Sequence, residues 1–486
     1  MPHVAPWTPS SDGTFTRPLF GLDDLQIAWN GAALRNVVLA RPDVATEVVE
    51  LDKKLHLKVR PFVDEEALTQ WLAKVYEVVD IGNQEAQDAF EKARVGLTTG
   101  ADQLLSPVAG RYDHLVRVTL LHGSNQQHVV IVRAWHVLMD GTVICEFIND
   151  ILANLNRPPA DFEEAKVEVA DRLSPHALDC VPGLAARYNT AEPDAKAWQT
   201  YLGSSKSAGF PVASSLAGQL APWPKDSATS RYHLQFDEQA TADFIAAAKA
   251  HEISVSTALS AAQIIASLRM SRAEVSGKSP VETVAQLNVA SLRPFMTGPK
   301  RNTMASGAEG VITAADSSAW DAALRAGKPL DEAENNAFWA IAQQVDASTR
   351  RAKEDPCETA SAAAHAFWTK FNAAADAMAK GKMANPRTKG LGLSQMGLMD
   401  QEGGLFSRQY EAATLVDVNI SVRSAGLMVG PHTWTFRGKL NLQLTYMAPM
   451  YESEAPAKLQ KLMGDVVARM SGHPGSYKVL HDVKIA

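Results

Sequence analysis

Cysteine is scarce in this chain of 486 residues. The three cysteines, Cys145, Cys180 and Cys357, are odd in number and far apart. Such a set makes neither the paired framework of a small secreted domain nor the ligand spacing of a zinc site. It suits a reducing compartment, so we expect a cytoplasmic protein. Cys145 falls in an apolar segment and is expected to be a core residue.

Long hydrophobic runs are also absent. No stretch approaches the ~18 apolar residues of a membrane-spanning helix, and the first fifteen residues lack the basic start and apolar run of a secretion signal. The net charge of −7 argues against a nucleic-acid partner attracted by bulk charge, but leaves room for a local basic patch. Phosphate loops of the Gly-x-x-x-x-Gly-Lys type, dinucleotide fingerprints and metal-ligand spacings are missing, so no metal or redox cofactor is expected.

The most informative segment covers residues 130–147, VIVRAWHVLMDGTVICEF. Two β-rich runs, Leu115–Leu121 and His128–His136, flank a turn-like stretch and predict a hairpin. His136 ends the second strand, where a base would face a cleft. Asp140 is placed to brace the turn, and Gly141 to let the backbone turn tightly before a helix. The plainer alternative is a strand-end histidine followed by a helix-capping aspartate.

The length and a composition of 46% hydrophobic and 21% charged residues describe a globular protein of two or three compact units. We expect a first α/β unit over residues 1–172, a crossover over 173–229 and a second α/β unit over 230–486. Apolar periodicity predicts helices over Glu65–Val79, Gly141–Leu155, Pro193–Leu202, Asp237–His251, Ser254–Met270, Leu330–Ala379 and Ala455–Met470. Strands are predicted over Arg231–Phe236, Val281–Val289, Thr414–Val422 and Thr433–Tyr446, and a Gly-rich loop over Asn385–Phe406.

Three segments after the His-x-x-x-Asp-Gly motif resemble segments of one known superfamily, in the same order. They are Ala197–Leu202 (AWQTYL), the strand-helix-helix unit His233–Arg269 and Lys439–Pro456 (KLNLQLTYMAPMYESEAP). In this order, over about residues 15–470, the chain resembles the superfamily of chloramphenicol acetyltransferase, peptide condensation domains and plant and fungal CoA-dependent acyltransferases. The resemblance implies an α/β fold of two chloramphenicol-acetyltransferase-like subdomains, with mixed sheets flanked by helices and an active-site tunnel between them.

The same resemblance implies roles for the motif. His136 would be the general base that deprotonates an acceptor hydroxyl or amine, which then attacks an acyl thioester. Asp140 would point away from the substrate and pair with an arginine. Arg293 in LNVASLRPF is the candidate partner, because this stretch resembles the Asn-Val-x-x-x-Arg segment of the family. An exposed arginine at a strand end is the alternative for Arg293.

The sequence differs from other branches of this superfamily at two points, and both indicate which branch it resembles most. Trp135 stands where peptide condensation domains carry a first histidine, which favours an O-acyltransferase. The Asp-Phe-Gly-Trp-Gly motif of plant members is absent, so the fungal secondary-metabolism branch, including trichothecene O-acetyltransferases, is more similar. Ser421, Ser424 and Gly426 in NISVRSAGLM resemble the Ser-x-Gly turn of fungal members and are candidates for oxyanion support. An ordinary turn explains them equally well.

A CoA donor would bring phosphates. The candidate binding residues form a basic cluster, Lys380, Lys382, Arg387 and Lys389. Solvated surface lysines are the alternative.

The sequence thus predicts a monomeric acyltransferase that moves an acetyl or other short acyl group from acyl-CoA to a hydroxyl of a hydrophobic secondary metabolite. Acyl-CoA would be a co-substrate, with no permanently bound cofactor. A condensation-type enzyme that takes its acyl group from a carrier protein, or uses an amine acceptor, is one alternative. A cyclase or binding protein on the same fold is another.

Overall fold

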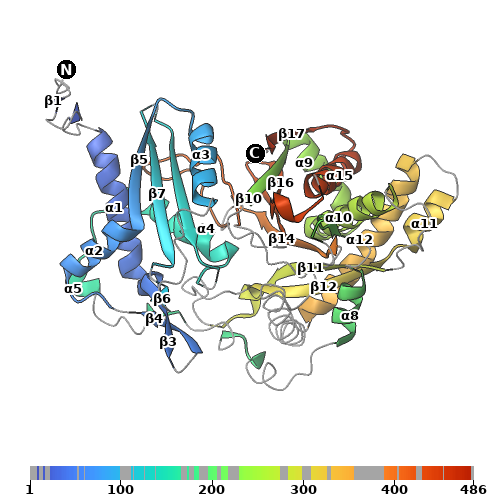
Figure 1. Cartoon of the computed structure of the whole chain (residues 1–486), viewed down its shortest axis with the longest axis horizontal. Helices are drawn as coiled ribbons and strands as arrows, with labels where there is room; N and C mark the ends of the chain where they lie inside the picture. The colour runs from blue at the N-terminus through green and yellow to red at the C-terminus, as the bar shows by residue number, and fades with distance from the viewer. Residues whose placement is uncertain are drawn as a thin grey trace.

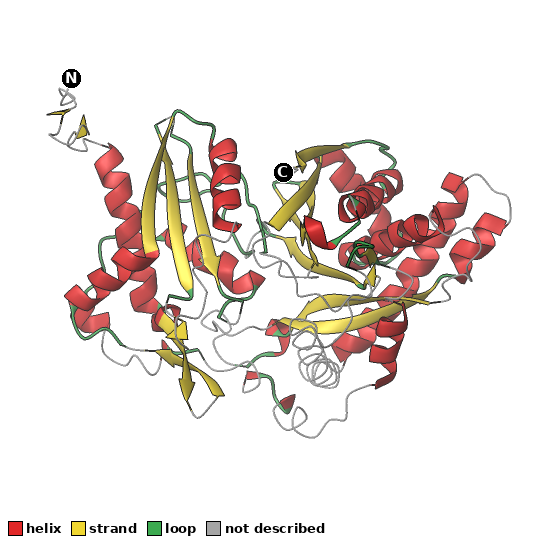
Figure 2. Cartoon of the chain, in the orientation of Figure 1, coloured by secondary structure: helices red, strands yellow, loops and turns green. Residues whose placement is uncertain are grey.

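Two α/β groups of elements follow one another along the chain (Figure 1). The computed structural model describes residues 8–9, 15–16, 22–51, 54–59, 61–98, 111–112, 114–124, 126–136, 138–165, 172–174, 180–184, 195–204, 209–216, 229–273, 283–297, 308–325, 330–354, 388–401, 404–422, 429–452 and 454–482. In both groups, helices lie against the faces of β-sheets (Figure 2). The chain therefore has the mixed α/β architecture that the sequence predicts.

The first group is built around a three-stranded sheet of order β5-β7-β8. β7 and β8 form the predicted antiparallel hairpin, and β5 runs parallel to β7. Its apolar core joins α1 and α4 to β7. The elements of this group are β1 (Thr8–Pro9), β2 (Phe15–Thr16), α1 (Leu22–Ala40), η1 (Pro42–Ala45), β3 (Thr46–Leu51), β4 (Lys54–Val59), α2 (Glu65–Val75), β5 (Tyr76–Gly82), α3 (Ala86–Thr98), β6 (Arg111–Tyr112), β7 (Val116–Gly123), β8 (His128–Ala134), α4 (Gly141–Ala153) and α5 (Phe162–Ala165).

The second group is built around a seven-stranded mixed sheet of order β12-β11-β14-β15-β16-β10-β17. Its elements are α8 (Ala195–Ser204), β9 (Phe210–Pro211), β10 (Thr229–Phe236), α9 (Glu238–Ala250), α10 (Val255–Ala273), β11 (Thr283–Ser291), η3 (Arg293–Phe295), β12 (Ala308–Asp316), α11 (Ser318–Arg325), α12 (Leu330–Glu354), β13 (Thr388–Lys389), β14 (Leu391–Leu398), β15 (Val429–Phe436), β16 (Lys439–Met447), η6 (Ala448–Met450), α15 (Ala455–Met470) and β17 (Tyr477–Asp482).

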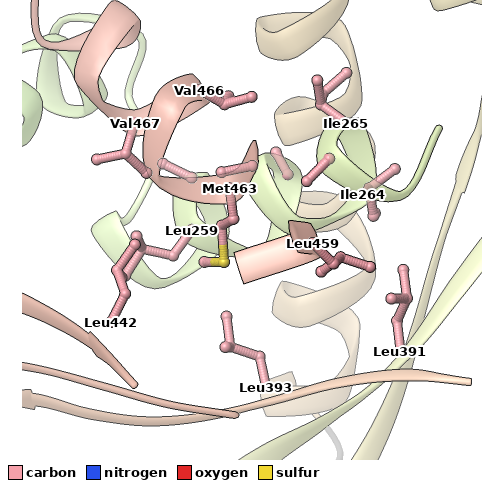
Figure 3. Close-up of a cluster of buried hydrophobic side chains, with 14 of the residues drawn as sticks. Leu259, Ile264, Ile265, Leu391, Leu393, Leu442, Leu459, Met463, Val466 and Val467 are labelled. Carbon is pink, nitrogen blue, oxygen red and sulfur yellow. The ribbon is translucent and has the colours of Figure 1, made fainter. Parts of the chain in front are cut away.

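One face of this sheet is apolar and makes the larger core. Alternation along β16 sends Leu440, Leu442 and Leu444 to the same side, where they are at most 2% exposed. Figure 3 shows Leu442 of β16 and the β14 leucines facing side chains of α10 and α15, including Ile264 and Met463. The two helices therefore cover this face.

The opposite face of the same strands is polar although it is buried. Cross-strand pairing places Asn441, Gln443 and Thr445 of β16 beside Trp434, His432 and Gly430 of β15. On the other side they pair with Gln235, His233 and Arg231 of β10. Directly paired residues share a face, so polar groups form rows across this side of the sheet.

Several sequence-predicted boundaries are confirmed. Asp237 and Ser254 accept hydrogen bonds from the backbone N–H groups of Ala240 (2.8 Å) and Thr257 (3.1 Å), as helix N-caps do. The predicted last helix coincides with α15. The predicted helix Leu330–Ala379 matches α12 as far as Glu354, and its next 25 residues lie outside the described part.

Two predictions about secondary structure in the first part of the chain and around β14 are wrong. The helix expected over Glu65–Val79 ends at Val75, because the β-prone residues from Tyr76 onward pair in parallel with β7. The Gly-rich loop expected over Asn385–Phe406 contains the strand β14. Gly392 is required there by close backbone approach, since an added Cβ would lie 2.8 Å from the carbonyl oxygen of Leu287.

The end of the chain differs from expectation as well. The strand expected over Thr414–Val422 is an irregular segment with a single β-bridge, from Thr414 to Gln409. The single strand expected over Thr433–Tyr446 is a hairpin. Arg437 and Gly438 both adopt positive φ, 49° and 73°, in its two-residue turn.

Among the described residues, no single helix has the length and apolar character to cross a membrane. Only α9 and α10 taken together meet those criteria, and they meet at an angle of 99°.

Candidate active site

The turn after β8 separates a buried segment from an exposed histidine. The carbonyl oxygen of Trp135 accepts hydrogen bonds from the N–H groups of Leu138 (2.9 Å) and Met139 (3.1 Å). Both of these residues are 3% exposed and belong to the first core, whereas His136 is exposed. The imidazole of His136 has no hydrogen-bond partner within the described part of the chain. The turn therefore holds its backbone and leaves its ring accessible.

Asp140 fixes the far end of this turn. One carboxylate oxygen, Oδ1, accepts the N–H of Val143 at 2.9 Å and so caps α4. The other, Oδ2, accepts a hydrogen bond from Arg293 Nη2 at 2.7 Å. The two side chains are 3% and 11% exposed, so this is a buried ion pair. The expected contact between Asp140 and Arg293 is present. Both carboxylate oxygens accept hydrogen bonds from other parts of the chain.

Arg293 reaches Asp140 from the second group of elements. It opens η3 just after β11, a strand of the seven-stranded sheet. Its positive charge also lies close to Glu146 of α4: burial raises the pKa of Glu146, and the charge of Arg293 opposes that rise. The arginine thus neutralises acidic groups at the start of α4 and joins the two groups of elements.

Cys145 is not a nucleophile in this structure. It is 2% exposed, and burial strongly raises the pKa of its thiol, with further contributions from Asp140 and Glu146. A buried thiol of this kind stays protonated and inert. The sequence prediction of a core residue is confirmed.

Gly141 lies at a close approach between the two groups. A Cβ atom at this position would lie 2.9 Å from Sδ of Met396, a residue of β14. Around this contact, side chains of α4 pack with Met399, Phe406 and Trp434 of the second group. In Figure 1, α4 lies on the side of the first group that faces the second. We call this contact region the seam.

His432 of β15 pairs with Ser394 of β14, two residues before the Met396 that approaches Gly141. Burial lowers the pKa of His432 to about 4; the hydrogen bond to Gly430 opposes this effect and the charge of His136 adds to it. Nδ1 of His432 lies 3.0 Å from the carbonyl oxygen of Gly430. Sequence reasoning assigned His432 no function, and the histidine alone was no signal. The alternation of β16 with its Asn, Gln and Thr residues was the usable sign that this sheet carries a polar face.

A second ionic contact crosses the seam beside the polar face. Arg231 of β10 is paired with Glu91 of α3 and donates to Asn419 Oδ1 at 2.5 Å. Burial lowers the pKa of Arg231 to about 10, and Glu91 opposes this effect, so the guanidinium stays charged at neutral pH. Sequence spacing gave no signal for this pair, whose members lie 140 residues apart.

A pocket of about 310 Å³ opens at the same seam, away from the motif. Its lining residues are Gln87, Gln235, Val416, Asp417, Phe436, Arg437, Lys439 and Leu480. His136 is not one of them. The tunnel expected around His136 is therefore not this pocket, and it remains a prediction.

The other predicted site residues are placed less completely. Ser421 is exposed near the end of the irregular segment, and the next residue, Val422, has its Cβ 3.6 Å from where a Cβ of Gly430 would lie. This brings the segment beside the start of β15. Lys389 belongs to β13 and pairs with Phe210 of β9. The remaining candidates, Ser424, Gly426, Lys380, Lys382 and Arg387, lie outside the described residues.

Comparison with known proteins gives no match in sequence and many in structure. No family model matches the chain, and neither does any curated protein. The trichothecene 15-O-acetyltransferase from Fusarium sporotrichioides superposes with a TM-score of 0.70 at 14% identity, over 94% of this chain and 88% of that one. The condensation domain of the monacolin K polyketide synthase gives 0.57 at 10% identity, over 93% and 90%. Polyketide synthase associated protein 5 from Mycobacterium tuberculosis gives 0.56 at 13% identity, over 92% of both chains.

These likenesses extend over nearly the whole chain. They confirm the expected fold, in which two subdomains resemble chloramphenicol acetyltransferase and condensation domains. At such low sequence identity these similarities support the fold but not the function. The chemistry has to be argued from the residues at the seam.

Proposed function

We propose that this protein is an acyl-CoA-dependent O-acyltransferase, in which His136 is the general base. The observation that carries the proposal is the contrast between Asp140 and His136, four residues apart. The carboxylate is buried and occupied by Val143 N–H and Arg293, whereas the imidazole is accessible at the seam. An imidazole whose backbone is fixed from both sides, and whose ring is open, suits proton transfer at neutral pH.

The reaction would proceed by direct transfer between two substrates. His136 takes the proton of the acceptor hydroxyl as its oxygen forms a bond to the thioester carbonyl carbon. The tetrahedral oxyanion then expels the thiolate by breaking the C–S bond, and the imidazolium returns the proton to sulfur. The products are an ester and a free thiol, so no other reactant is needed.

Asp140 would contribute to this reaction only by positioning His136. Because its side chain is 3% exposed and paired with Arg293, the carboxylate is shielded from a substrate. Its pairing with Arg293 instead holds the turn that aims His136. Ser421 and Ser424 are proposed to support the oxyanion, and the basic cluster at residues 380–389 to meet the CoA phosphates.

The fold also supports a donor carried on a protein, since condensation domains share it. One experiment separates the donors. The purified protein is incubated with acetyl-CoA, or with an acetylated phosphopantetheine carrier protein, and a panel of hydrophobic alcohols and amines. Products are identified by mass spectrometry. Acetyl esters from acetyl-CoA support the proposal. Products from the carrier protein alone favour the condensation-type enzyme, and amides alone an N-acyltransferase. If no product forms with either donor, acyl transfer is contradicted.

A further inference from the structure

We propose that His432 is an acceptor-recognition residue: its Nε2 atom accepts a hydrogen bond from a second hydroxyl group of the acceptor, beside the hydroxyl that His136 deprotonates. The natural acceptor would then be a compound with at least two hydroxyl groups in reach of each other. This inference rests on the proposed function, since it assigns the substrate class of the same site.

The hydrogen bonds of His432 fix which ring nitrogen is open. Nδ1 lies 3.0 Å from the carbonyl oxygen of Gly430, which also accepts the hydroxyl of Thr445 at 3.3 Å. A carbonyl oxygen can only accept, so Nδ1 must carry the hydrogen. In a neutral imidazole the other nitrogen, Nε2, is then an acceptor. Within the described residues Nε2 has no partner.

Burial keeps the His432 ring neutral at neutral pH, with its hydrogen on Nδ1. It lowers the pKa of His432 to about 4, so the ring is neutral and Nε2 carries no hydrogen. Such an atom binds a hydroxyl or an N–H group and rejects a ketone or ester oxygen. A site built to bind a polar group discriminates strongly against ligands that lack it, because its own polar atom is then left without a partner.

The position of His432 is suited to a bound acceptor. It lies on the polar face of the sheet, paired with Ser394 of β14 and Gln443 of β16. Trp434, the next residue on the same face of β15, packs in the seam with Cys145 of α4. His136 belongs to the turn that leads into α4, and Gly141 at the start of α4 approaches Met396, two residues after the Ser394 that pairs with His432. The two imidazoles therefore come from different groups of elements that contact each other at the seam.

Two substitutions separate recognition from structure. In His432→Asn, the amide nitrogen can replace Nδ1 as the donor to Gly430, while the acceptor at the Nε2 position is lost. In His432→Gln, the longer amide can restore an acceptor there. His473→Asn, the same change at a partly exposed histidine after α15, is the control. The acceptors are 1-phenylethane-1,2-diol and 2-phenylethanol, which differ by one hydroxyl, with acetyl-CoA as donor.

We expect the wild type to prefer the diol by about tenfold in kcat/KM, as one hydrogen bond to an acceptor that has no partner among the described residues implies. His432→Asn should lower kcat/KM for the diol about tenfold more than for 2-phenylethanol, through KM, with Tm close to that of the control. His432→Gln should regain part of the preference. An equal preference in wild type and His432→Asn overturns the proposal.

Binding is tested without turnover by ¹⁵N NMR of the histidine rings. The His432 signals are assigned by their loss in His432→Asn, and Nε2 should show the shift of an unprotonated nitrogen. The diol should move the Nε2 signal, in the wild type and in His136→Ala, and 2-phenylethanol should not. An unmoved signal overturns the proposal even if acetyl transfer occurs. A moved signal without any transfer supports recognition and counts against the proposed reaction.

Discussion

Asp140 and Arg293 lie 153 residues apart in the sequence, and their side chains are joined by a 2.7 Å hydrogen bond in a buried ion pair. The pair connects the N-terminus of α4 in the first subdomain to η3 in the second. The turn that carries His136 therefore depends on a residue from the other half of the chain.

Removing one partner of this pair should destabilise the protein. Asp140→Ala leaves the Arg293 guanidinium without its carboxylate and uncaps α4, so the free energy of unfolding should fall by about 3–5 kcal/mol. Arg293→Ala should have a similar effect, and the double variant should lose less than the sum. Urea unfolding measures all three.

Lys461→Ala is the control for this experiment, because its pair with Asp465 has a 57% exposed lysine. Its effect should stay below about 1 kcal/mol. If Asp140→Ala abolished activity and left stability as in the control, Asp140 would belong to the chemistry and not to the support of the turn.

Gly141→Ala should strain the seam. The added Cβ would lie 2.9 Å from Sδ of Met396, so either the thioether or α4 must move. Sδ lies near the end of a flexible side chain that can shift, so the cost should be at the low end of the ~1–3 kcal/mol typical of overpacking. Met396→Ala in the same chain should relieve it. Gly203→Ala in α8 is the matched control, because nothing lies within 4 Å of its new Cβ, and it should not destabilise the protein. Additive effects of Gly141→Ala and Met396→Ala would show that the two residues do not interact.

The basic cluster should affect the donor alone. Neutralising Lys380, Lys382, Arg387 and Lys389 together is expected to raise KM for acyl-CoA and to leave KM for a neutral acceptor nearly unchanged. Phosphate contacts far from the reacting carbon mostly give uniform binding, which appears in KM more than in kcat. The effect should shrink at high salt. If the four-fold variant bound CoA at low salt as tightly as the wild type does, the four residues would have no role in binding the donor.

His432 should make stability depend on pH. Its pKa is lowered from 6.5 to about 4 in the folded protein, mainly by burial, so the unfolded chain binds more protons between these values. Stability therefore falls as pH decreases from about 6.5 towards 4, by at most about 3 kcal/mol. The difference between wild type and His432→Asn isolates this contribution from other groups. A difference that is constant from pH 7 to 4 would mean that His432 is not held neutral.

Local signals predicted the helices well. Asp237 and Ser254 each precede a long apolar-periodic run, and a capping side chain satisfies N–H groups that any helix start leaves open. Local signals failed where tertiary contacts decided the outcome. Gly392 indicated a loop by composition, yet it serves the close pairing of β14 with β11. Tyr76 continued a helical pattern, but its pairing with Val118 ended the helix.

The site was only partly accessible to sequence reasoning. His136, Asp140 and Gly141 are close in sequence, so their spacing predicted a strand, a turn and a cap. The contact of Asp140 with Arg293 was predicted only through the family resemblance, because no local pattern connects residues so far apart. His432 and the Glu91–Arg231 pair were missed for the same reason. His432 becomes visible when strand register shows which side chains share a face, and the Glu91–Arg231 pair when α3 is placed beside β10.

The measurement that tests the account most directly is the turnover of His136→Ala and His136→Gln with acetyl-CoA and an acceptor that the wild type acetylates, with His473→Asn as control. Free thiol and ester are quantified together, and circular dichroism establishes that each variant is folded. The account predicts loss of at least about 10²-fold in kcat for both His136 variants, as expected for a general base, with Tm near that of the wild type. Turnover within about tenfold of the wild type in a folded His136→Ala protein would contradict the assignment of His136 as the base.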